Sequence, residues 1–338
     1  MNILLTSVGR RTYLINYFKE ALGNKGKVYI ANSTLDTSSF VITDNKVVTP
    51  LIYDDNYIPF LLNYCEINNI KAIISLYDID LMILSKNIEK FESKGIKVVV
   101  SSLQVINICN DKWETYKFLK EKGINTPLSF IELNDAIENI ESEKMRFPII
   151  VKPRWGMGSI DIFQANNLDE LIIFYKKLSL EIFDSNLKYE SIIDKQHSVI
   201  IQEKIVGQEY GVDVINDLKG NYINSIVKKK FAMRAGETDC AETVYVPEII
   251  AIGDKIGKEL KHIANLDVDV FYDGQTVSVL EMNARFGGGY PFSHIAGVNL
   301  PLAIVLWLRD LRVAPELLEC KLGIKGYKNL SIISNEES

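Results

Sequence analysis

Short apolar runs alternate with segments of helical periodicity through the first third of the chain. Four runs have the mostly apolar pattern of strands that are buried on both faces of a sheet: residues 2–7, 28–32, 72–76 and 97–100. Three intervening segments have the spacing of helices: residues 12–22, 57–68 and 79–91. Because strands and helices alternate, we expect a doubly wound parallel α/β domain over residues 1–105, with right-handed crossovers.

The rest of the chain has a mixed pattern. Helical spacing is found at residues 112–122, 133–142, 168–178, 249–264 and 301–309. Strand patterns are found at residues 147–152, 199–206, 209–214, 222–230, 266–271 and 276–282. A turn is expected at Gly207, and the last residues predict a peripheral tail. Residues 179–198 are polar and irregular, so we expect a flexible excursion there.

The hairpin predicted over residues 266–282 carries a candidate metal site, whose formation depends on the strand register. Side chains alternate along a strand, so Glu281 and Asn283 share one face. A two-residue loop would turn Asp269 away from them, whereas a three-residue loop or a one-residue bulge would bring all three to the same face. Carboxylate and amide oxygens suit Mg²⁺, and Arg285 follows at a spacing that could present a guanidinium to a phosphate or carboxylate. The alternative is a strand end with solvated polar side chains.

Composition and charge disfavour several classes of protein. The 338 residues are 47% hydrophobic and 24% charged, which is typical of globular proteins with two or three domains. The net charge of −6 disfavours nucleic acid as the main partner, because a surface that follows phosphates needs an excess of basic residues. The most apolar later run, residues 300–308, is far shorter than the roughly 20 residues that cross a bilayer, so no membrane association is expected.

The four cysteines indicate a reducing compartment. Cys65, Cys109, Cys240 and Cys320 are far apart and form no C-x-x-C pair or zinc-binding pattern with histidine. The N-terminal apolar run is short and is followed by arginines instead of being preceded by them, which differs from a signal peptide. We therefore expect a cytoplasmic protein with reduced thiols.

A glycine-containing loop after a lysine-bearing strand is a candidate phosphate site. Lys152 lies on the predicted strand and is followed by Gly156-Met157-Gly158-Ser159. Backbone N–H groups of such a loop can close over phosphates, because glycine lets the chain approach them. The order differs from a Walker loop, in which the lysine follows the glycines, and the motif alone has low specificity.

Polar residues at the carboxyl ends of the first predicted strands are candidates for substrate contacts, because open α/β sheets bind ligands at that edge. The turn at residues 7–11, with Arg10 and Arg11, could hold an anion at a helix N-terminus, or it is an ordinary turn. Asp78 and Asp80 could line the same crevice and attract an ammonium group, although capping of the next helix is slightly favoured. An amino acid would satisfy both charges.

A cluster of cations stands out in this acidic chain. Lys228 and Lys230 share one face of a predicted strand, Lys229 has the opposite face, and Arg234 follows. At least one of these lysines is expected to be solvated. His294 is a candidate catalytic or substrate contact, but a structural role is favoured for it.

The order of these motifs resembles the ATP-grasp superfamily, in particular the branch of the carbamoyl phosphate synthetase large subunit and its stand-alone carboxylate–amine ligase relatives. The resemblance covers roughly residues 1–310. It rests on a combination of motifs, each of low specificity alone: Lys112, Lys152 with its glycine loop, Gln202-Glu203-Lys204-Ile205 followed by Gly207-x-Glu209-Tyr210, Asp269, and Glu281-x-Asn283-x-Arg285. One departure is Asp269, where the carbamoyl phosphate synthetase pattern often has Gln, although Asp occurs elsewhere in the superfamily.

The resemblance implies a role for each motif residue. The ATP phosphates would be bound by Lys112, Lys152, Gly156, Gly158 and Ser159. Adenine and ribose would be held by Glu203, Lys204, Ile205, Val206 and Glu209. Two Mg²⁺ ions, or Mn²⁺, would be bound by Asp269, Glu281 and Asn283, with Glu281 bridging. The γ-phosphate and acyl-phosphate oxygens would meet Arg285 and one of Lys228, Lys230 and Arg234. The substrates would be flanked by Arg10, Arg11, Asp78, Asp80 and His294.

The resemblance also implies the domain organisation. A Rossmann-like domain over residues 1–105 would precede the two lobes of an ATP-grasp domain, a small lobe over 106–200 and a large lobe over 201–320, with a tail over 321–338. The expected fold class is therefore α/β followed by α+β.

The activity implied by the resemblance is ATP- and Mg²⁺-dependent ligation of a carboxylate to an amine. Transfer of the γ-phosphoryl group to the carboxylate would make an acyl phosphate, which the amine attacks, and ADP and phosphate are released. The expected partners are small, amino-acid-like molecules, and a homodimer is compatible with the sequence. Two alternatives remain open: a kinase-like enzyme that stops at an acyl or carbamoyl phosphate, and a non-catalytic nucleotide-binding protein.

Overall fold

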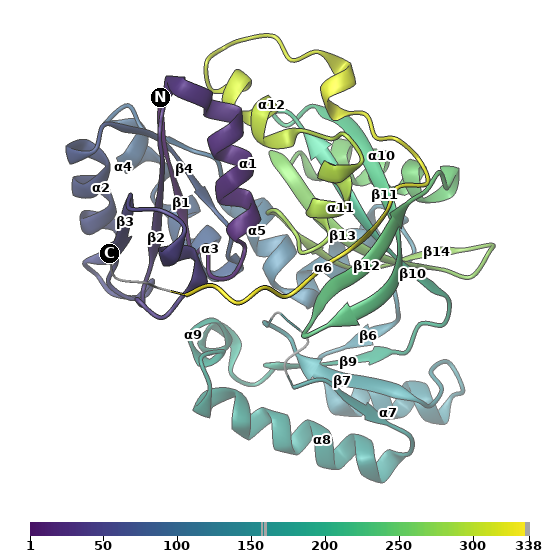
Figure 1. The fold of residues 1–338 in the computed structure, drawn as a ribbon. Coiled ribbons are helices and arrows are strands. Elements are labelled where there is room, and N and C mark those ends of the chain that lie inside the picture. Colours follow the sequence, from purple (N-terminus) through teal and green to yellow (C-terminus); the bar gives the residue numbers. More distant parts are fainter. Residues whose placement is uncertain (157, 159–160, 335–338) are drawn as a thin grey trace.

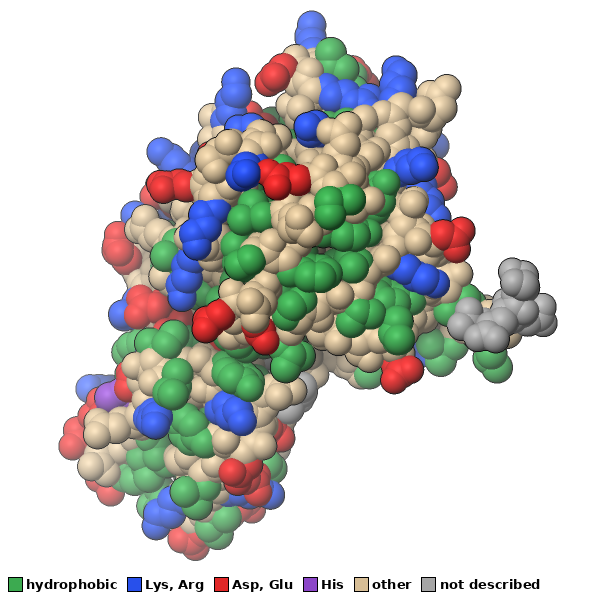
Figure 2. Space-filling view, turned by 90° about the vertical axis from the view of Figure 1, so that its left-hand side faces the viewer, with side chains coloured by type: hydrophobic (Ala, Val, Ile, Leu, Met, Phe, Trp, Pro, Cys, Tyr) green, Lys and Arg blue, Asp and Glu red, His purple; other side chains and the backbone are tan. Residues whose placement is uncertain are grey.

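One parallel and two antiparallel sheets organise the chain in the computed structural model, which describes residues 1–156, 158 and 161–334. The parallel sheet forms the N-terminal domain, and the antiparallel sheets form a small lobe and a large lobe (Figure 1). Figure 2 shows the small lobe as a projection below the rest of the molecule. The predicted fold class, a doubly wound domain followed by two lobes, is confirmed.

The N-terminal sheet is parallel throughout, with the order β3-β2-β1-β4-β5. Its strands are β1 (Asn2–Thr6), β2 (Val28–Asn32), β3 (Lys46–Val48), β4 (Ile70–Ser75) and β5 (Lys97–Val98). Its helices are α1 (Thr12–Leu22), α2 (Tyr57–Ile67), α3 (Asp78–Lys86) and α4 (Ile88–Glu92). Because α1 covers one face and α2 and α4 cover the other (Figure 1), the central strands are apolar on both sides. The helix predicted over residues 79–91 is two helices, since Asn87 ends α3 and precedes α4.

The small lobe is built on a four-stranded antiparallel sheet with the order β6-β9-β7-β8. The chain reaches it through α5 (Leu103–Asn110) and α6 (Lys112–Glu121). Its elements are β6 (Ser129–Phe130), α7 (Leu133–Glu141), β7 (Ile149–Pro153), β8 (Phe163–Ala165), α8 (Leu168–Glu181), η3 (Ile182–Asp184), α9 (Lys188–Ser191), η4 (Ile192–Asp194) and β9 (Val199–Glu203). The expected irregular excursion over residues 179–198 is therefore wrong. Helical turns occur there instead, and buried Ile182 and Leu187 anchor them. The turns are too short to show a helical period, and other apolar residues of the stretch, such as Leu180, Ile192 and Ile193, are exposed.

The large lobe is a six-stranded antiparallel sheet with the order β14-β13-β10-β11-β12-β15. Its elements are β10 (Gln208–Asn216), β11 (Tyr222–Arg234), β12 (Glu237–Thr243), α10 (Pro247–Leu260), β13 (Ala264–Tyr272), β14 (Val277–Asn283), α11 (Tyr290–Ile295), α12 (Leu300–Trp307), η5 (Pro315–Leu318) and β15 (Lys325–Tyr327). Gly207 separates two sheets, since β9 and β10 do not pair with each other. The predicted tail is not wholly peripheral, because β15 pairs with β12. The predicted helix over 249–264 ends earlier, at Leu260.

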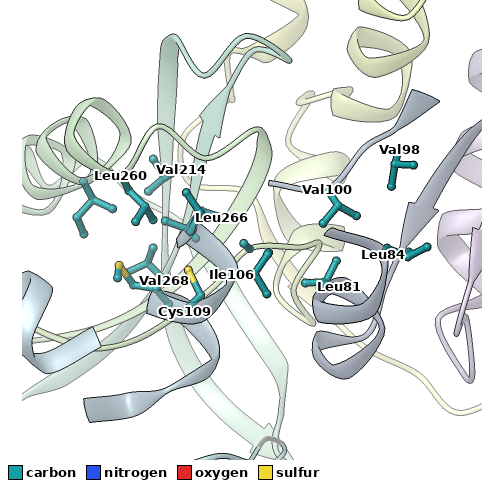
Figure 3. Close-up of a cluster of buried hydrophobic side chains, with 14 of the residues drawn as sticks. Leu81, Leu84, Val98, Val100, Ile106, Cys109, Val214, Leu260, Leu266 and Val268 are labelled. Carbon is teal, nitrogen blue, oxygen red and sulfur yellow. The ribbon is translucent and has the colours of Figure 1, made fainter. Parts of the chain in front are cut away.

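The hydrophobic core is continuous between the N-terminal domain and the large lobe. Figure 3 shows Leu81, Val100 and Ile106 of the first region in line with Val214 and Leu266 of the large sheet. The small lobe has a separate core around β7, β9 and α8. Across the described ranges, no helix is long and apolar enough to cross a membrane.

Candidate functional site

The β13–β14 hairpin contains a one-residue bulge that sets the orientation of its acidic residues. Tyr272 pairs with Val277, and the register shifts between Asp269 and Val270, so that Leu280 is the extra residue. Asp269 consequently lies opposite Glu281. The bulge alternative considered from the sequence is the one the structure has, and the three predicted ligands share one face.

Asp267 joins this face, opposite Asn283, although it was not singled out from the sequence. Simple alternation, which places residues 267 and 269 on the same side of a strand, was the available signal. Lys230 Nζ lies 2.6 Å from Asp269 Oδ1 and 2.7 Å from Glu209 Oε1. Burial raises the pKa of Asp269 to about 7, and the charges of Asp267 and Glu281 add to this effect while Lys230 opposes it. The face therefore has an excess of negative charge that a cation would relieve.

Arg285 joins the large lobe to the N-terminal domain. Its Nη2 lies 3.0 Å from Asp78 Oδ2, and its Nη1 donates to Asp267 Oδ2 at 3.2 Å. Burial opposes ionisation of the guanidinium, but the two carboxylates outweigh burial and raise its pKa. Arg285 is thus at the edge of the acidic face, already paired with two carboxylates.

Two lysines approach the glycine loop from different elements. Lys112, the first residue of α6, donates from Nζ to the carbonyl oxygen of Gly156 at 2.6 Å. Lys152 on β7 is only 4% exposed, and its ammonium has no hydrogen bond or ion pair to any residue that the structure describes. Burial lowers its pKa to about 8, helped by Lys112 and opposed by Glu281. An anion is the missing counter-charge, because a buried, unpaired ammonium is costly.

Of the predicted phosphate loop, Gly156 and Gly158 are described, whereas Ser159 lies outside the described residues. Gly158 touches the tip of the β11–β12 hairpin, where a Cβ added to Gly236 would lie 2.6 Å from the Gly158 carbonyl oxygen. A side chain at residue 236 would therefore push the hairpin away from the loop.

Arg154 links this loop to the helix that carries Lys112. It is buried and donates from Nε and Nη2 to the two oxygens of Asp111, each at 2.7 Å. Asp111 is also the N-cap of α6, since it accepts from the Trp113 N–H at 2.9 Å. A third bond from Nη1 reaches Asp194 at 2.9 Å. The sequence offers Asn110 or Asp111 as the cap of this helix, and the structure has Asp111, whereas the role of Arg154 depends on partners that are distant in the chain.

The predicted adenine and ribose residues lie at the junction of the two lobes. Glu203 ends β9, residues 204–206 belong to neither sheet, and Val206 is 82% exposed. Lys204 Nζ donates to Gln164 Oε1 at 2.8 Å. Ile205 follows Lys204 in the same connection between the sheets. Glu209 on β10 is paired with Lys230. This junction therefore presents backbone groups beside a carboxylate.

Two of the predicted catalytic cations point elsewhere. Lys228 is 1% exposed and forms an interior ion pair with Asp213, which also accepts from Ser293 Oγ at 2.5 Å. Arg234 is on the solvent side of the β11–β12 hairpin and binds Asp239 at 2.6 Å. Lys230 is thus the residue of this cluster that faces the acidic hairpin.

The two aspartates at the end of β4 have different surroundings, and neither caps α3. Asp80 is fully buried, which raises its pKa, and it accepts hydrogen bonds from four hydroxyl groups, those of Thr6, Ser7, Tyr57 and Ser75. It is therefore an interior residue and does not line a crevice. Asp78 faces the acidic hairpin through its ion pair with Arg285.

The arginines after β1 and His294 also have protein partners. Arg11 donates to the carbonyl oxygens of Leu76 and Phe286 at 2.7 and 3.1 Å. Arg10 and Arg11 lie 3.6 and 3.5 Å from Glu237. Burial opposes ionisation of Glu237, but Lys328 and the two arginines lower its pKa to about 2. His294 stacks on Tyr17 with ring centroids 3.6 Å apart, which agrees with the structural role favoured from the sequence.

Comparisons with known proteins match both regions of the chain. Residues 3–99 match the family described as PylC-like, N-terminal domain, and residues 109–289 match the ATP-grasp domain family. The carbamoyl phosphate synthase large chain of Clostridium acetobutylicum is 24% identical over 328 residues, which cover 92% of this chain and 29% of that protein. The chain thus spans under a third of the length of this relative.

Solved structures share the fold at low sequence identity. Biotin carboxylase from Campylobacter jejuni has a TM-score of 0.74 and 16% identity, covering 94% of this chain and 73% of that one. L-amino acid ligase from Bacillus licheniformis has a TM-score of 0.64 and 17% identity, covering 90% and 73%. The likeness extends over the N-terminal domain and both lobes.

Proposed function

This chain belongs to the ATP-grasp family, and on that premise we propose that it is an ATP- and Mg²⁺-dependent ligase that joins a carboxylate to an amine. One observation carries the proposal: Lys112 and Gly156, which are candidates for phosphate binding, line the same pocket as Glu281 and Asn283 of the acidic hairpin. The ammonium group of Lys112 suits a phosphate, and the oxygen atoms of Glu281 and Asn283 would suit Mg²⁺.

The lysines are the proposed phosphate ligands. Lys152 would gain a counter-charge that no residue in the described part of the chain supplies, and Lys112 would contact the same phosphates from α6. Glu203, Lys204 and the backbone of residues 205–206 would hold adenine at the lobe junction, and Glu209 would accept the ribose hydroxyls. Gly156 and Gly158 would let the loop approach the triphosphate.

The donor set of the hairpin fits Mg²⁺. Asp269 and Glu281 supply hard oxygen ligands whose mutual repulsion a divalent ion would relieve, and Asn283 adds an amide oxygen on the same face. Within the part of the chain that the structure describes, no three His, Cys, Asp or Glu side chains form a metal-binding group. Asn283 and phosphate oxygens would therefore complete the coordination, and bound Mg²⁺ would offset the charge that develops during phosphoryl transfer.

The chain's own cations would position the reacting groups. Lys230 is the proposed contact for the γ-phosphate, because its ammonium already lies beside Asp269 and Glu209. Arg285 would orient the carboxylate and then the acyl phosphate at the boundary with the N-terminal domain. Closure of the lobes around both substrates would keep water from the intermediate. The likeness to an L-amino acid ligase supports amino-acid-like substrates.

Release of ADP tests this function. The protein is incubated with ATP, MgCl₂ and either N-acetyl amino acids as carboxylates, amino acid amides as amines, or pairs of the two, and ADP and phosphate are measured together. We expect release only when both a carboxylate and an amine are supplied. Hydroxylamine trapping of an acyl phosphate without an amine would instead favour the kinase-like alternative. Failure of the protein to bind Mg·ADP would refute the proposal.

A further inference from the structure

Two buried carboxylates that the proposed ATP and metal roles do not use lie beside the candidate site. Asp78 is the first residue of α3 in the N-terminal domain, and Glu190 lies on α9 of the small lobe. Each is more than nine-tenths buried. Both line the small pocket that also contains Lys112, Glu281 and Asn283. The pocket therefore brings together acidic groups from all three parts of the fold.

Each of these two carboxylates has hydrogen-bonding capacity to spare. Asp78 Oδ2 is bound by Arg285, but Asp78 Oδ1 is buried without a partner among the residues described. Burial raises the pKa of Glu190 to about 7, with Asp78 adding to the effect and Lys112 opposing it, and no hydrogen bond to Glu190 contributes. Arg285 is shared between Asp78 and Asp267, so the two buried carboxylates Asp78 and Glu190 are short of positive charge. A cation is thus the ligand that this corner of the pocket lacks.

The spacing favours an ammonium group over a further metal ion. Metal ligands must converge to about 2.1 Å from Mg²⁺. Among the described side chains, no three His, Cys, Asp or Glu residues form a metal-binding group, so Asp78, Glu190 and Glu281 do not converge in this way. An ammonium group has three N–H donors and reaches acceptor oxygens at about 2.9 Å, so it can bridge carboxylates that are further apart.

A second opening gives an amine its own route to these carboxylates. Glu190 and Asn110 also line a groove of about 1380 Å³, which is bounded by Tyr53, Trp155 and Tyr189. The groove and the small pocket therefore meet at Glu190. A molecule in the groove could place its amine beside Glu190, which the groove shares with the pocket that contains Lys112 and Glu281.

We propose that Asp78 and Glu190 bind the ammonium group of a primary amine substrate that enters through this groove. The inference rests on the proposed function, because the amine is the second substrate of that ligase. It specifies a cationic primary amine as the acceptor and assigns its recognition to a residue of the small lobe, which no motif in the sequence indicates.

The test uses n-butylamine as the probe and the full chain with Mg·ADP. Thermal unfolding is followed at increasing n-butylamine, with tetramethylammonium chloride at equal ionic strength as a control for salt. We expect n-butylamine, but not tetramethylammonium, to raise the unfolding temperature. In Glu190→Gln, the n-butylamine concentration needed for half of this rise should increase at least tenfold. Glu114→Gln, a change of the same kind in the same groove, should behave as the wild type.

A second variant keeps the proposal testable if Glu190→Gln does not fold. Glu190→Lys supplies its own ammonium and should fold but no longer respond to n-butylamine. The proposal is overturned if the wild type does not respond, or if Glu190→Gln responds as the wild type does. Binding of Mg·ADP is measured calorimetrically in the same samples. Loss of Mg·ADP binding in the wild type would refute the ligase function, whereas intact Mg·ADP binding with an unchanged amine response in Glu190→Gln would refute the ammonium site alone.

Discussion

Asp269 and Glu281 face each other across the β13–β14 hairpin, so that two carboxylates share one largely buried surface. Their repulsion contributes to the raised pKa of Asp269, together with burial and with Asp267. Lys230 neutralises part of this charge. A divalent ion between them would replace repulsion by attraction, which is why this pair is central to the proposed chemistry.

Glu281→Gln is expected to lower kcat for ADP release by about 100-fold or more, because the amide keeps the shape of the side chain but removes the charge that would bridge metal ions. The circular dichroism spectrum and unfolding temperature should remain those of the wild type. Glu248→Gln, at an exposed position on α10, is the matched control. Normal turnover in Glu281→Gln would refute the metal assignment.

Lys152→Met should weaken Mg·ATP binding by about 2 kcal/mol, roughly 30-fold, without loss of stability. The methionine keeps the apolar stem in place and removes the ammonium group of a buried residue that has no charged partner among the residues described. The free energy of unfolding in urea should therefore stay equal or rise. Titration calorimetry gives the affinity, with exposed Lys117→Met as the control. An unchanged affinity would argue against the phosphate role.

Arg154→Met should lower the free energy of unfolding by about 3 kcal/mol, because it leaves the buried carboxylate of Asp111 unpaired. Asp111→Asn combined with Arg154→Met should cost less than the sum of the two single changes. Since the pair connects the Lys112 helix to the loop after Lys152, KM for ATP should rise in both single variants. Additive losses in a double-mutant cycle would show that the pair is not coupled.

The pH dependence of stability should contain a contribution from His262. Burial lowers its pKa to about 4, although Nε2 donates to the Val214 carbonyl oxygen. The unfolded chain titrates near pH 6.5, so between these values it binds more protons than the folded chain, and stability falls as the pH is lowered. The loss amounts to about 3 kcal/mol over this window.

Urea unfolding from pH 7.5 to 4 checks this prediction by comparison with His262→Gln. The variant should have a shallower decline below pH 6.5, because its side chain does not titrate. His197, whose pKa is raised by Asp194 and Glu132 against an opposing effect of burial, is present in both proteins and cancels in the comparison. Parallel curves for the two proteins would contradict the assignment to His262.

Local pattern was sufficient for much of the architecture. The strands of the N-terminal domain are apolar runs because both faces of their sheet are covered, and Asp111 caps α6 within its own segment. Alternation along β14 placed Glu281 and Asn283 together. The bulge at Leu280 could not be chosen from the sequence, because it depends on how β13 and β14 pair, and nothing in their residue types marks it.

Contacts between segments that are distant in the chain could not be predicted from the sequence. The pairing of Asp78 with Arg285 spans 207 positions, and Glu190 reaches the pocket only because residues 182–194 form helical turns. Asp80 and Lys228 carry charges that usually lie at the surface, yet each is enclosed by partners from other elements. Without knowledge of those partners, a sequence analysis assigns such ionisable residues to the surface and treats them as candidate site residues.

The separate core of the small lobe has a mechanical consequence. A rotation of the lobe about residues 122–128 and 204–207 would leave its own hydrophobic core and that of the remaining molecule closed to water. Such a rotation would have to separate specific contacts between the lobe and the rest of the molecule, among them the buried pair of Arg154 with Asp111 and the stacked rings of Tyr53 and Tyr189. Binding and release of ligands in the pocket would then require these contacts to break, without unfolding of either hydrophobic core.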